Sequence, residues 1–245
     1  MTSSKRDRAA ALPKDLQEAL RRRLAGRAGA AGTTPPGKDG TPGTAGRPGI
    51  PPADRSEPLP LSFAQQRLWF LDRLRPGDSR YNSAVALRLT GALDRAALSR
   101  ALDTVVERHE ALRTTFQETD GRPAQTVSPA GPVPLPVRDL PAAGTAALEE
   151  ALLAEYERPF DLSGGPLLRA LLLREPGGAE TAHVLLLTAH HIVTDGWSMG
   201  VVLEELCAAY DALARGTAPD LPPVAAQYPD FAVWQRERLS GPRLE

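Results

Sequence analysis

Cysteine is almost absent from this sequence, because Cys207 is the only one among 245 residues. A single cysteine excludes an intrachain disulfide and leaves no cysteine cluster for a structural zinc site. A reducing cytoplasm is therefore the location that we expect. Long apolar runs are also lacking: the longest, HVLLLTAH at residues 183–190, is far too short to span a bilayer. The N-terminus is charged from Lys5 onward with no apolar segment behind it, so we expect neither a signal peptide nor a membrane span.

Histidine is scarce as well, with four residues, and aromatic residues make up only 5% of the chain. What is abundant is a mixture of 42% hydrophobic and 24% charged residues, which is typical of a soluble globular protein with a sizeable core. The net charge of −1 is unevenly distributed. Residues 1–55 carry 11 basic and 5 acidic side chains, so the rest of the chain is acidic. The N-terminal tail and the body therefore have different properties.

Residues 12–27 have the pattern of a short amphipathic helix within the tail segment 1–27. Its apolar stripe consists of leucines four residues apart, and three arginines lie on its polar side: Leu12, Leu16, Leu20 and Leu24, with Arg21, Arg22 and Arg23. The stripe and the basic cluster predict binding to an acidic partner. Isolated helices of this length are marginal in water, so a helix that packs back on the body or frays is the alternative.

A segment rich in glycine and proline follows over residues 28–58. Glycine recurs at every third position from 37 to 49, which is the collagen period. Five triplets without partner chains do not hold a triple helix, so we predict an extended flexible linker. The predicted organisation is a docking or linker helix at 1–27, the linker at 28–58 and a folded domain at 59–245.

From residue 59 onward, helices and strands alternate. The first helix is predicted at 62–74 with Ser62 as its N-cap. The later elements are a strand at 83–91, a helix at 94–109 capped by Asp94, a hairpin at 111–128 that turns at Asp120-Gly121, a helix at 145–160, a hairpin at 165–190 that turns at Gly177-Gly178, and helices at 198–214 and 228–239. The outgoing arm of the second hairpin is so apolar that it should lie inside a sheet. This order predicts an α+β fold in which a mixed β-sheet is packed with helices.

The stretch AHHIVTDGWSMG at 189–200 places two of the four histidines side by side at the end of a buried strand. Successive strand residues point to opposite faces, so only one of His190 and His191 can face a cleft. Asp195 follows His191 by four residues, and we expect it to orient that imidazole or to hold the loop through a cation elsewhere. Gly196 is expected to turn the loop back with a positive φ, ahead of a helix that starts near Ser198.

Three other interpretations of this stretch compete with an acid–base site. Two histidines and an aspartate could bind a metal, but adjacent histidines on a strand diverge and no third-ligand cluster accompanies them, so no metal is predicted. A serine hydrolase would need a nucleophile elbow, which is absent, and Ser198 suits a helix cap better. A purely structural histidine pair is the third interpretation. The other two histidines, His109 and His183, are interpreted as structural.

Four stretches, in this order, resemble the core motifs of the condensation domains of nonribosomal peptide synthetases. They are SFAQQRLWFLDRLRPGDSRYN at 62–82, RHEALRTTF at 108–116, HHIVTDGWSMG at 190–200 and YPDFAVWQ at 228–235. The resemblance covers residues 59 to about 239, and chance agreement at all four stretches is negligible. The HHxxxDG motif alone is less specific, because related acyltransferases and epimerization domains share it. The residues WSMGVVLEEL that follow are similar to the condensation type.

The resemblance implies a chloramphenicol-acetyltransferase-like lobe and an acyltransferase activity of the kind used in antibiotic biosynthesis. The reaction would form an amide bond between a carrier-bound acyl or peptidyl donor and a carrier-bound aminoacyl acceptor. The resemblance implies that His191 is catalytic, that His190 is structural, and that Gly196 offers a backbone N–H near the developing oxyanion. It also implies a salt bridge between Asp195 and Arg67 that holds the loop. No cofactor is bound directly, because the substrates are carried on phosphopantetheine arms of carrier domains.

The sequence departs from the family in length. Family members run to about twice the matched stretch, as two similar lobes with the active site between them. We therefore expect the N-terminal lobe alone, incomplete and inactive without the C-terminal lobe. The expected partners are that lobe and the upstream and downstream peptidyl carrier domains, with no nucleic acid and no membrane. The alternative function is a non-catalytic docking module whose N-terminal helix recruits an upstream synthetase subunit.

Overall fold

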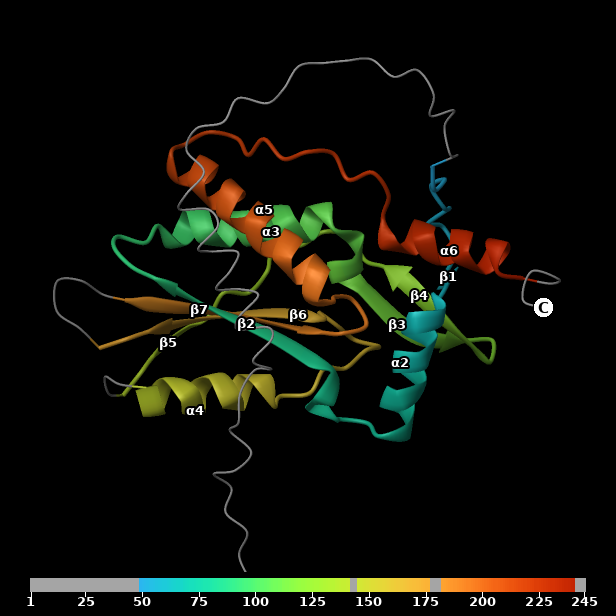
Figure 1. Cartoon of the computed structure of the whole chain (residues 1–245), viewed down its shortest axis with the longest axis horizontal. Helices are drawn as coiled ribbons and strands as arrows, with labels where there is room; N and C mark the ends of the chain where they lie inside the picture. The colour runs from blue at the N-terminus through green and yellow to red at the C-terminus, as the bar shows by residue number, and fades with distance from the viewer. Residues whose placement is uncertain (1–48, 142–144, 177–181, 241–245) are drawn as a thin grey trace, which may run out of the picture. The chain divides into compact units, whose positions relative to one another are not determined.

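The computed structural model describes residues 49–141, 145–176 and 182–240 (Figure 1), and these residues belong to one compact unit. The predicted helix at residues 12–27 and the predicted linker as far as residue 48 lie outside the described residues, as does the predicted turn at Gly177-Gly178. No helix within the described ranges is both long enough and apolar enough to cross a membrane.

The centre of the fold is a four-stranded mixed sheet in the order β2-β7-β6-β5. Its strands are β2 (Asn82–Leu89), β5 (Val137–Asp139), β6 (Leu168–Arg174) and β7 (His183–His190). β5 pairs with β6 in parallel, whereas β7 is antiparallel to both β6 and β2. Because β7 has a neighbour on each side, the interior position predicted from its apolar run is confirmed. The α+β fold with a mixed sheet is confirmed as well.

Helices cover both faces of this sheet, as Figure 1 shows: α3 and α5 lie on one face and α4 on the other. Their bounds are α3 (Arg95–Arg108), α4 (Thr145–Tyr156) and α5 (Gly196–Ala214). Alternate residues of β7 divide between these layers, because Leu187 packs with α3 and α5 whereas Leu186 packs with α4. His190 continues the even-numbered series, so its side chain points to the α4 face of the sheet.

A second sheet of three antiparallel strands has the order β1-β4-β3 and was not foreseen from the sequence. Its strands are β1 (Leu59–Pro60), β3 (Thr114–Thr119) and β4 (Arg122–Val127). The predicted hairpin turn is confirmed, because Asp120 and Gly121 have φ values of 52° and 74°, the left-handed conformation that a two-residue hairpin turn requires. β1 has two residues, too few to show a strand period, so its pairing with the hairpin could not be predicted.

Two further helices flank the second sheet: α2 (Phe63–Leu74), which packs near Phe116 of β3, and α6 (Tyr228–Arg238), which contacts β1. The predicted N-cap of α2 is confirmed, because Ser62 Oγ accepts a hydrogen bond from the backbone N–H of Gln65 at 3.1 Å. The predicted N-cap of α3 is confirmed in the same way by Asp94. A short polar side chain that precedes a run of periodically spaced apolar residues therefore predicted the start of both helices correctly.

The helix predicted at 145–160 is shorter than expected, since α4 ends at Tyr156. Pro159 disfavours a helical conformation at the preceding residue, so the helix cannot continue through it. Carbonyl oxygens at the end of the helix have no partner within it, and a side chain of β2 binds two of them. Asn82 Nδ2 donates to Tyr156 O at 2.6 Å and to Arg158 O at 2.9 Å. The chain then turns inward, and Phe160 enters the core.

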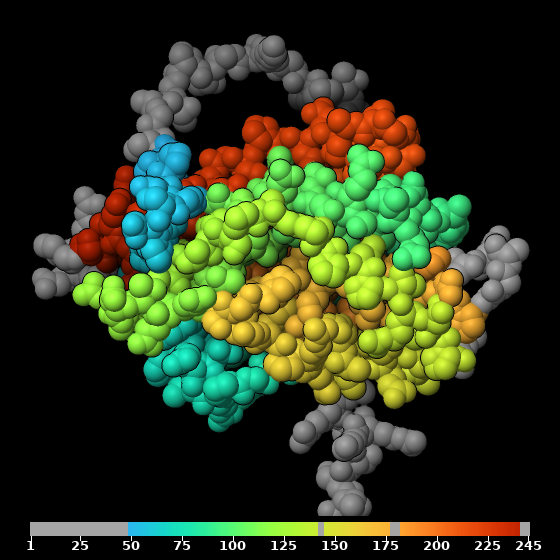
Figure 2. All heavy atoms as spheres, turned by 180° about the vertical axis from the view of Figure 1, so that it is seen from behind, coloured from blue at the N-terminus to red at the C-terminus, as the bar shows by residue number. Residues whose placement is uncertain are grey.

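The residues just before β1 are attached to the body by ion pairs. Arg55 pairs with Glu110 at 2.5 Å and with Asp230 at 2.7 Å, and Asp230 also accepts from the backbone N–H of Ala53. Figure 2 shows this N-terminal segment, in blue, against the red helix α6. Glu110 and Asp230 belong to the second and fourth motif stretches, so Arg55 joins the two. The sequence gives no sign of this role, because Arg55 falls within the predicted linker.

Candidate active site

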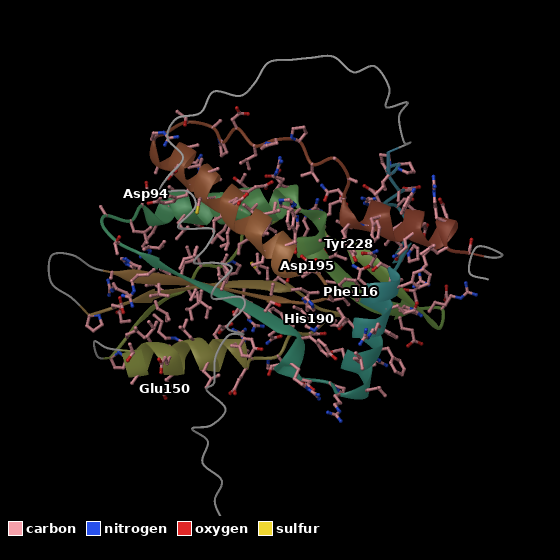
Figure 3. All side chains as sticks on the ribbon, in the orientation of Figure 1. Asp94, Phe116, Glu150, His190, Asp195 and Tyr228 are labelled. Atoms are coloured by element: carbon pink, nitrogen blue, oxygen red, sulfur yellow. The ribbon has the colours of Figure 1, made fainter. Side chains whose placement is uncertain are left out.

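His190 is the last residue of β7 and its side chain is buried, with 2% of its surface exposed (Figure 3). Its Nδ1 accepts a hydrogen bond from the backbone N–H of Ile192 at 3.1 Å, so the neutral ring carries its proton on Nε2. The rings of Tyr81 and Phe160 pack near it, with centroids 6.3 and 6.2 Å from that of His190. Burial, and secondarily the neighbouring His191, lowers the pKa of His190 to about 4. His190 is therefore neutral at physiological pH.

His191 is exposed, in contrast, and its imidazole makes no hydrogen bond with any residue in the described ranges. Its backbone is firmly held, because its N–H donates to Tyr81 O at 2.7 Å. The turn that follows is closed by His190 O, which accepts from Val193 N–H at 3.1 Å and from Thr194 Oγ1 at 3.3 Å. The arrangement presents an exposed imidazole on a fixed backbone. The two adjacent histidines thus have opposite environments, as strand geometry predicts.

Asp195 forms the N-cap of α5 (Figure 3). Its carboxylate accepts from Ser198 N–H at 2.7 Å, and Ser198 Oγ accepts from Asp195 N–H at the same distance. This reciprocal capping box starts the helix at Gly196, so the predicted start near Ser198 is two residues late. The backbone N–H of Ser198 holds the pKa of the Asp195 carboxyl below its usual range. Ser198 is occupied in the cap, which is the role preferred for it over that of a nucleophile.

Two expectations about this loop are wrong. None of the ion pairs among the described residues joins Arg67 to Asp195; Arg67 is exposed on α2, and Asp195 is bound locally instead. Gly196 does not have a positive φ, because it is already the first residue of a right-handed helix. No described residue accepts a hydrogen bond from its N–H, and a Cβ built there would meet nothing within 4 Å. The backbone at the start of α5 is therefore open to approach.

Because Asp195 stabilises the loop as a helix cap, Asp195→Ala is expected to lower the free energy of unfolding by about 1 kcal/mol, and Asp195→Ser to lower it less. The cap's contribution is present above the unfolded pKa of the carboxyl and is lost as the pH falls through the lower folded value. Urea denaturation measures both effects. Arg67→Ala is the matched control and should change the free energy of unfolding little. If Arg67→Ala lowered it as much as Asp195→Ala does, that result would support the ion pair between Arg67 and Asp195 after all.

The remaining histidines lie away from this loop. His109 Nε2 lies 2.7 Å from Glu205 Oε2, which also accepts from Arg108 Nε at 2.9 Å, so His109 joins α3 to α5. His183 begins β7, and its Nδ1 is buried without a hydrogen-bond partner. Among the described residues, no group of three histidine, cysteine or acidic side chains is close enough to hold a metal ion.

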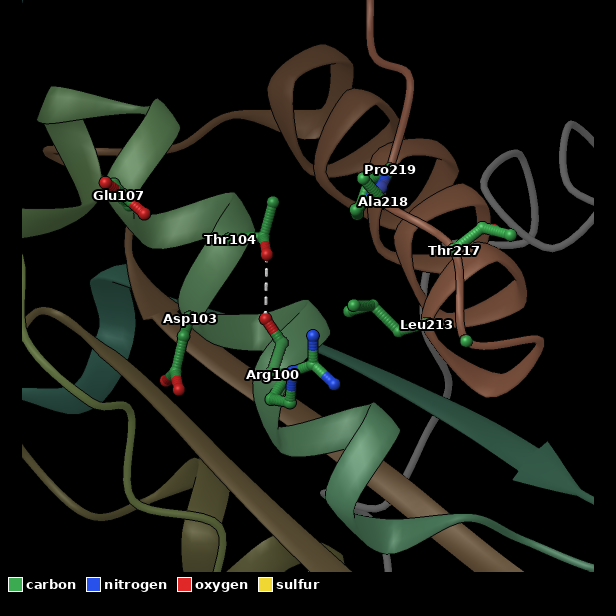
Figure 4. A pocket seen from close by; sticks show the side chains of 9 residues that line it. Arg100, Asp103, Thr104, Glu107, Leu213, Thr217, Ala218 and Pro219 are labelled. Carbon is green, nitrogen blue, oxygen red and sulfur yellow. Dashed lines mark hydrogen bonds between the residues drawn. The ribbon is translucent and has the colours of Figure 1, made fainter.

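A groove of about 450 Å³ lies elsewhere, between α3 and the end of α5 (Figure 4). It is lined by Arg100, Asp103, Thr104 and Glu107 from α3, and by Leu213 and Thr217. Two of these polar side chains are already bound within the protein: Asp103 accepts from Val133 N–H, and Thr104 donates to Arg100 O. None of the predicted site residues lines this groove, so it is separate from the histidine pair.

Comparison with known proteins identifies the family. The family model described as Condensation domain matches residues 55–245. Malpibaldin synthetase of Mortierella alpina is 45% identical over 199 residues, which cover 80% of this chain and 4% of that protein. Phosphinothricin tripeptide synthetase PhsC of Streptomyces viridochromogenes is 46% identical over 195 residues, which cover 78% of this chain and 18% of that protein. The chain thus spans only a small part of the curated relatives that it matches.

Solved structures agree with this assignment. The X-domain in its complex with OxyB from teicoplanin biosynthesis matches with a TM-score of 0.69 and 37% identity, over 80% of this chain and 41% of that chain. The starter condensation domain of rhizomide synthetase RzmA matches with a TM-score of 0.67 and 26% identity, over 76% and 45%. This chain spans less than half of either structure. With the α+β architecture and the ordered motif stretches, these matches show that the chain belongs to the condensation domains of nonribosomal peptide synthetases.

Proposed function

We propose that this chain is the lobe of a condensation domain that carries the active-site histidine. The complete domain, meaning this sequence together with a second lobe, joins a carrier-bound acyl or peptidyl donor to the amino group of a carrier-bound aminoacyl acceptor. The observation that supports this most strongly is the environment of His191. Its imidazole is exposed and forms no hydrogen bond with the residues that the structure describes, while its backbone N–H is bound at 2.7 Å and the preceding histidine is buried in the core. A reactive side chain on a rigid support is what positioned catalysis requires.

The acceptor amine attacks the thioester carbonyl of the donor, the carbon–sulfur bond breaks, and the nitrogen loses a proton while the thiolate gains one. His191 serves this step by accepting the proton of the attacking amine or by holding the nitrogen in line. An α-amine is largely protonated at neutral pH, so the base role begins only after the first proton has left. The N–H of Gly196, at the positive end of α5, supports the developing oxyanion.

The proposed partners follow from this reaction. They are the second lobe and the upstream and downstream peptidyl carrier domains, whose phosphopantetheine arms carry both substrates, so the chain needs no cofactor of its own and no nucleic acid. We place the reaction in the cytoplasm. The domain limits of 1–27, 28–58 and 59–245 stay a prediction, and so does the docking of residues 12–27 to an upstream subunit.

The test is a reconstituted condensation reaction. The complete domain is mixed with a donor-loaded and an acceptor-loaded carrier domain, and the acceptor carrier is analysed by mass spectrometry for the amide product. We expect product with the complete domain and none with this chain alone, because the substrates need the second wall of the active site. A complete domain that binds both carriers and forms no amide would contradict the proposal and favour the alternative, a non-catalytic carrier-binding module.

A further inference from the structure

A cluster of partly buried polar contacts lies next to the residues that pack on His190, and its centre is Arg169 of β6. The guanidinium group donates from Nε to Glu155 Oε1 at 2.6 Å, and both side chains are nearly buried, at 12% and 8% exposure. It also donates to three carbonyl oxygens at the end of α4 and in the turn that follows: Pro159 O at 3.1 Å, Arg158 O at 2.8 Å and Glu155 O at 3.3 Å. One arginine therefore fixes the course of the chain between α4 and Phe160.

The same guanidinium lies over the ring of Phe160, with its Cζ 3.7 Å from the ring centroid. Phe160 meets the ring of His190 edge-on, at 6.2 Å and an interplanar angle of 78°. The aromatic ring of Phe160 thus contacts both the guanidinium cation and the buried histidine. Asn82, which is paired with His190 across β2 and β7, binds the same turn from the other side through Tyr156 O and Arg158 O.

The orientation of the His190 ring contributes to the position of the His191 backbone, together with the bond from His191 N–H to Tyr81 O. His190 Nδ1 accepts the N–H of Ile192, so the ring spans the one residue between them, and that residue is His191. A rotation of the His190 ring would release Ile192 N–H, and the turn would then depend on the bonds to His190 O and Tyr81 O alone. Contacts therefore run without a break from Arg169 through Phe160 and His190 to the backbone of His191.

We propose that Arg169 is a positioning residue for condensation, acting through Phe160 and His190 on the placement of the His191 imidazole. This inference rests on the proposed function of His191. It requires an arginine and not simply a positive charge, because the planar guanidinium donates in several directions at once while it stacks on Phe160. A lysine keeps the charge opposite Glu155 but cannot bind three carbonyl oxygens and cover the ring together.

The experiment compares Arg169→Lys with Arg174→Lys, a matched substitution on the same strand. Arg174 forms an exposed ion pair with Asp139 and has no contact with the histidine pair. In the complete domain, Arg169→Lys is expected to lower kcat at least about tenfold with KM unchanged, because sub-ångström misplacement of a catalytic group slows the chemical step without altering carrier binding. Arg174→Lys is expected to keep the wild-type kcat and KM.

A second measurement needs no activity and can be made on this chain. The NMR signals of the His190 ring protons report the edge contact with Phe160, so they should shift in Arg169→Lys and stay unchanged in Arg174→Lys. Phe160→Leu, which keeps an apolar side chain but removes the stacking face, should reproduce both the shift and the loss of kcat. A stable Arg169→Lys variant with wild-type kcat, or with unshifted His190 signals, would overturn the inference. A failure of the proposed function itself would give a different result, namely full activity in His191→Ala.

Discussion

His191→Ala in the complete domain is expected to lower the rate of amide-bond formation by about 10²–10⁴-fold, the range typical for a positioned acid–base group. The free energy of unfolding should stay within about 0.5 kcal/mol of the wild type, as for other exposed side chains without partners. The reason is that the His191 ring is exposed and forms no hydrogen bond with a described residue, whereas the backbone contact to Tyr81 O does not depend on the side chain. Single-turnover assays with loaded carriers and urea denaturation measure the two quantities.

Two controls make this result interpretable. His191→Asn retains a hydrogen-bonding side chain without the acid–base range of imidazole, so partial activity in this variant would indicate that holding the amine matters more than accepting its proton. Carrier binding should be unchanged in both variants. Amide formation at the wild-type rate in His191→Ala would show that His191 is not the catalytic group.

Acidification is expected to destabilise the fold through His190. Its pKa is about 4 in the folded protein and about 6.5 when solvated, so the folded state prefers the neutral ring. The stabilisation is fully present above the unfolded pKa of 6.5, decreases as the pH falls from 6.5 to 4, and is lost below the folded pKa. A difference of this size corresponds to about 3 kcal/mol over that window, a large part of the stability of an ordinary domain.

The His190 contribution is separated from that of the carboxylates by a variant that cannot titrate. His190→Asn places an amide oxygen where Nδ1 accepts from Ile192 N–H, so the turn keeps an acceptor while the pH-dependent charge disappears. We expect urea denaturation of this variant to give a flatter dependence of stability on pH between 4 and 6.5 than the wild type gives. His191→Asn removes only the smaller cause of the lowered pKa of His190, so it should flatten the dependence less than His190→Asn does. Equal slopes in the wild type and His190→Asn would show that the buried ring is not held neutral.

Local patterns were sufficient for much of this protein. The N-caps at Ser62 and Asp94 and the turn at Asp120-Gly121 depend on residues within three positions of one another, so the linear sequence contains all their partners. The apolar run of β7 placed that strand inside the sheet for a similarly direct reason. The family, too, could be recognised from four ordered stretches. The cap at Asp195 follows the same rule, from Asp195 and Ser198 three positions apart, although the sequence was interpreted as placing Asp195 to orient His191 or to bind a distant cation.

The contacts that organise the site depend on how the layers stack. Arg55 reaches Glu110 and Asp230 only because β1, α6 and the short helix after α3 meet in space, and no period in the sequence encodes that meeting. Arg169 binds the end of α4 because α4 covers the face of the sheet to which its strand position points. His190 is buried beside an exposed His191 for the same reason, because its side chain points to the face of the sheet that α4 covers. Side chains from separate elements find their partners only after the apolar faces have been buried, which is a property of the whole packing and not of any one segment.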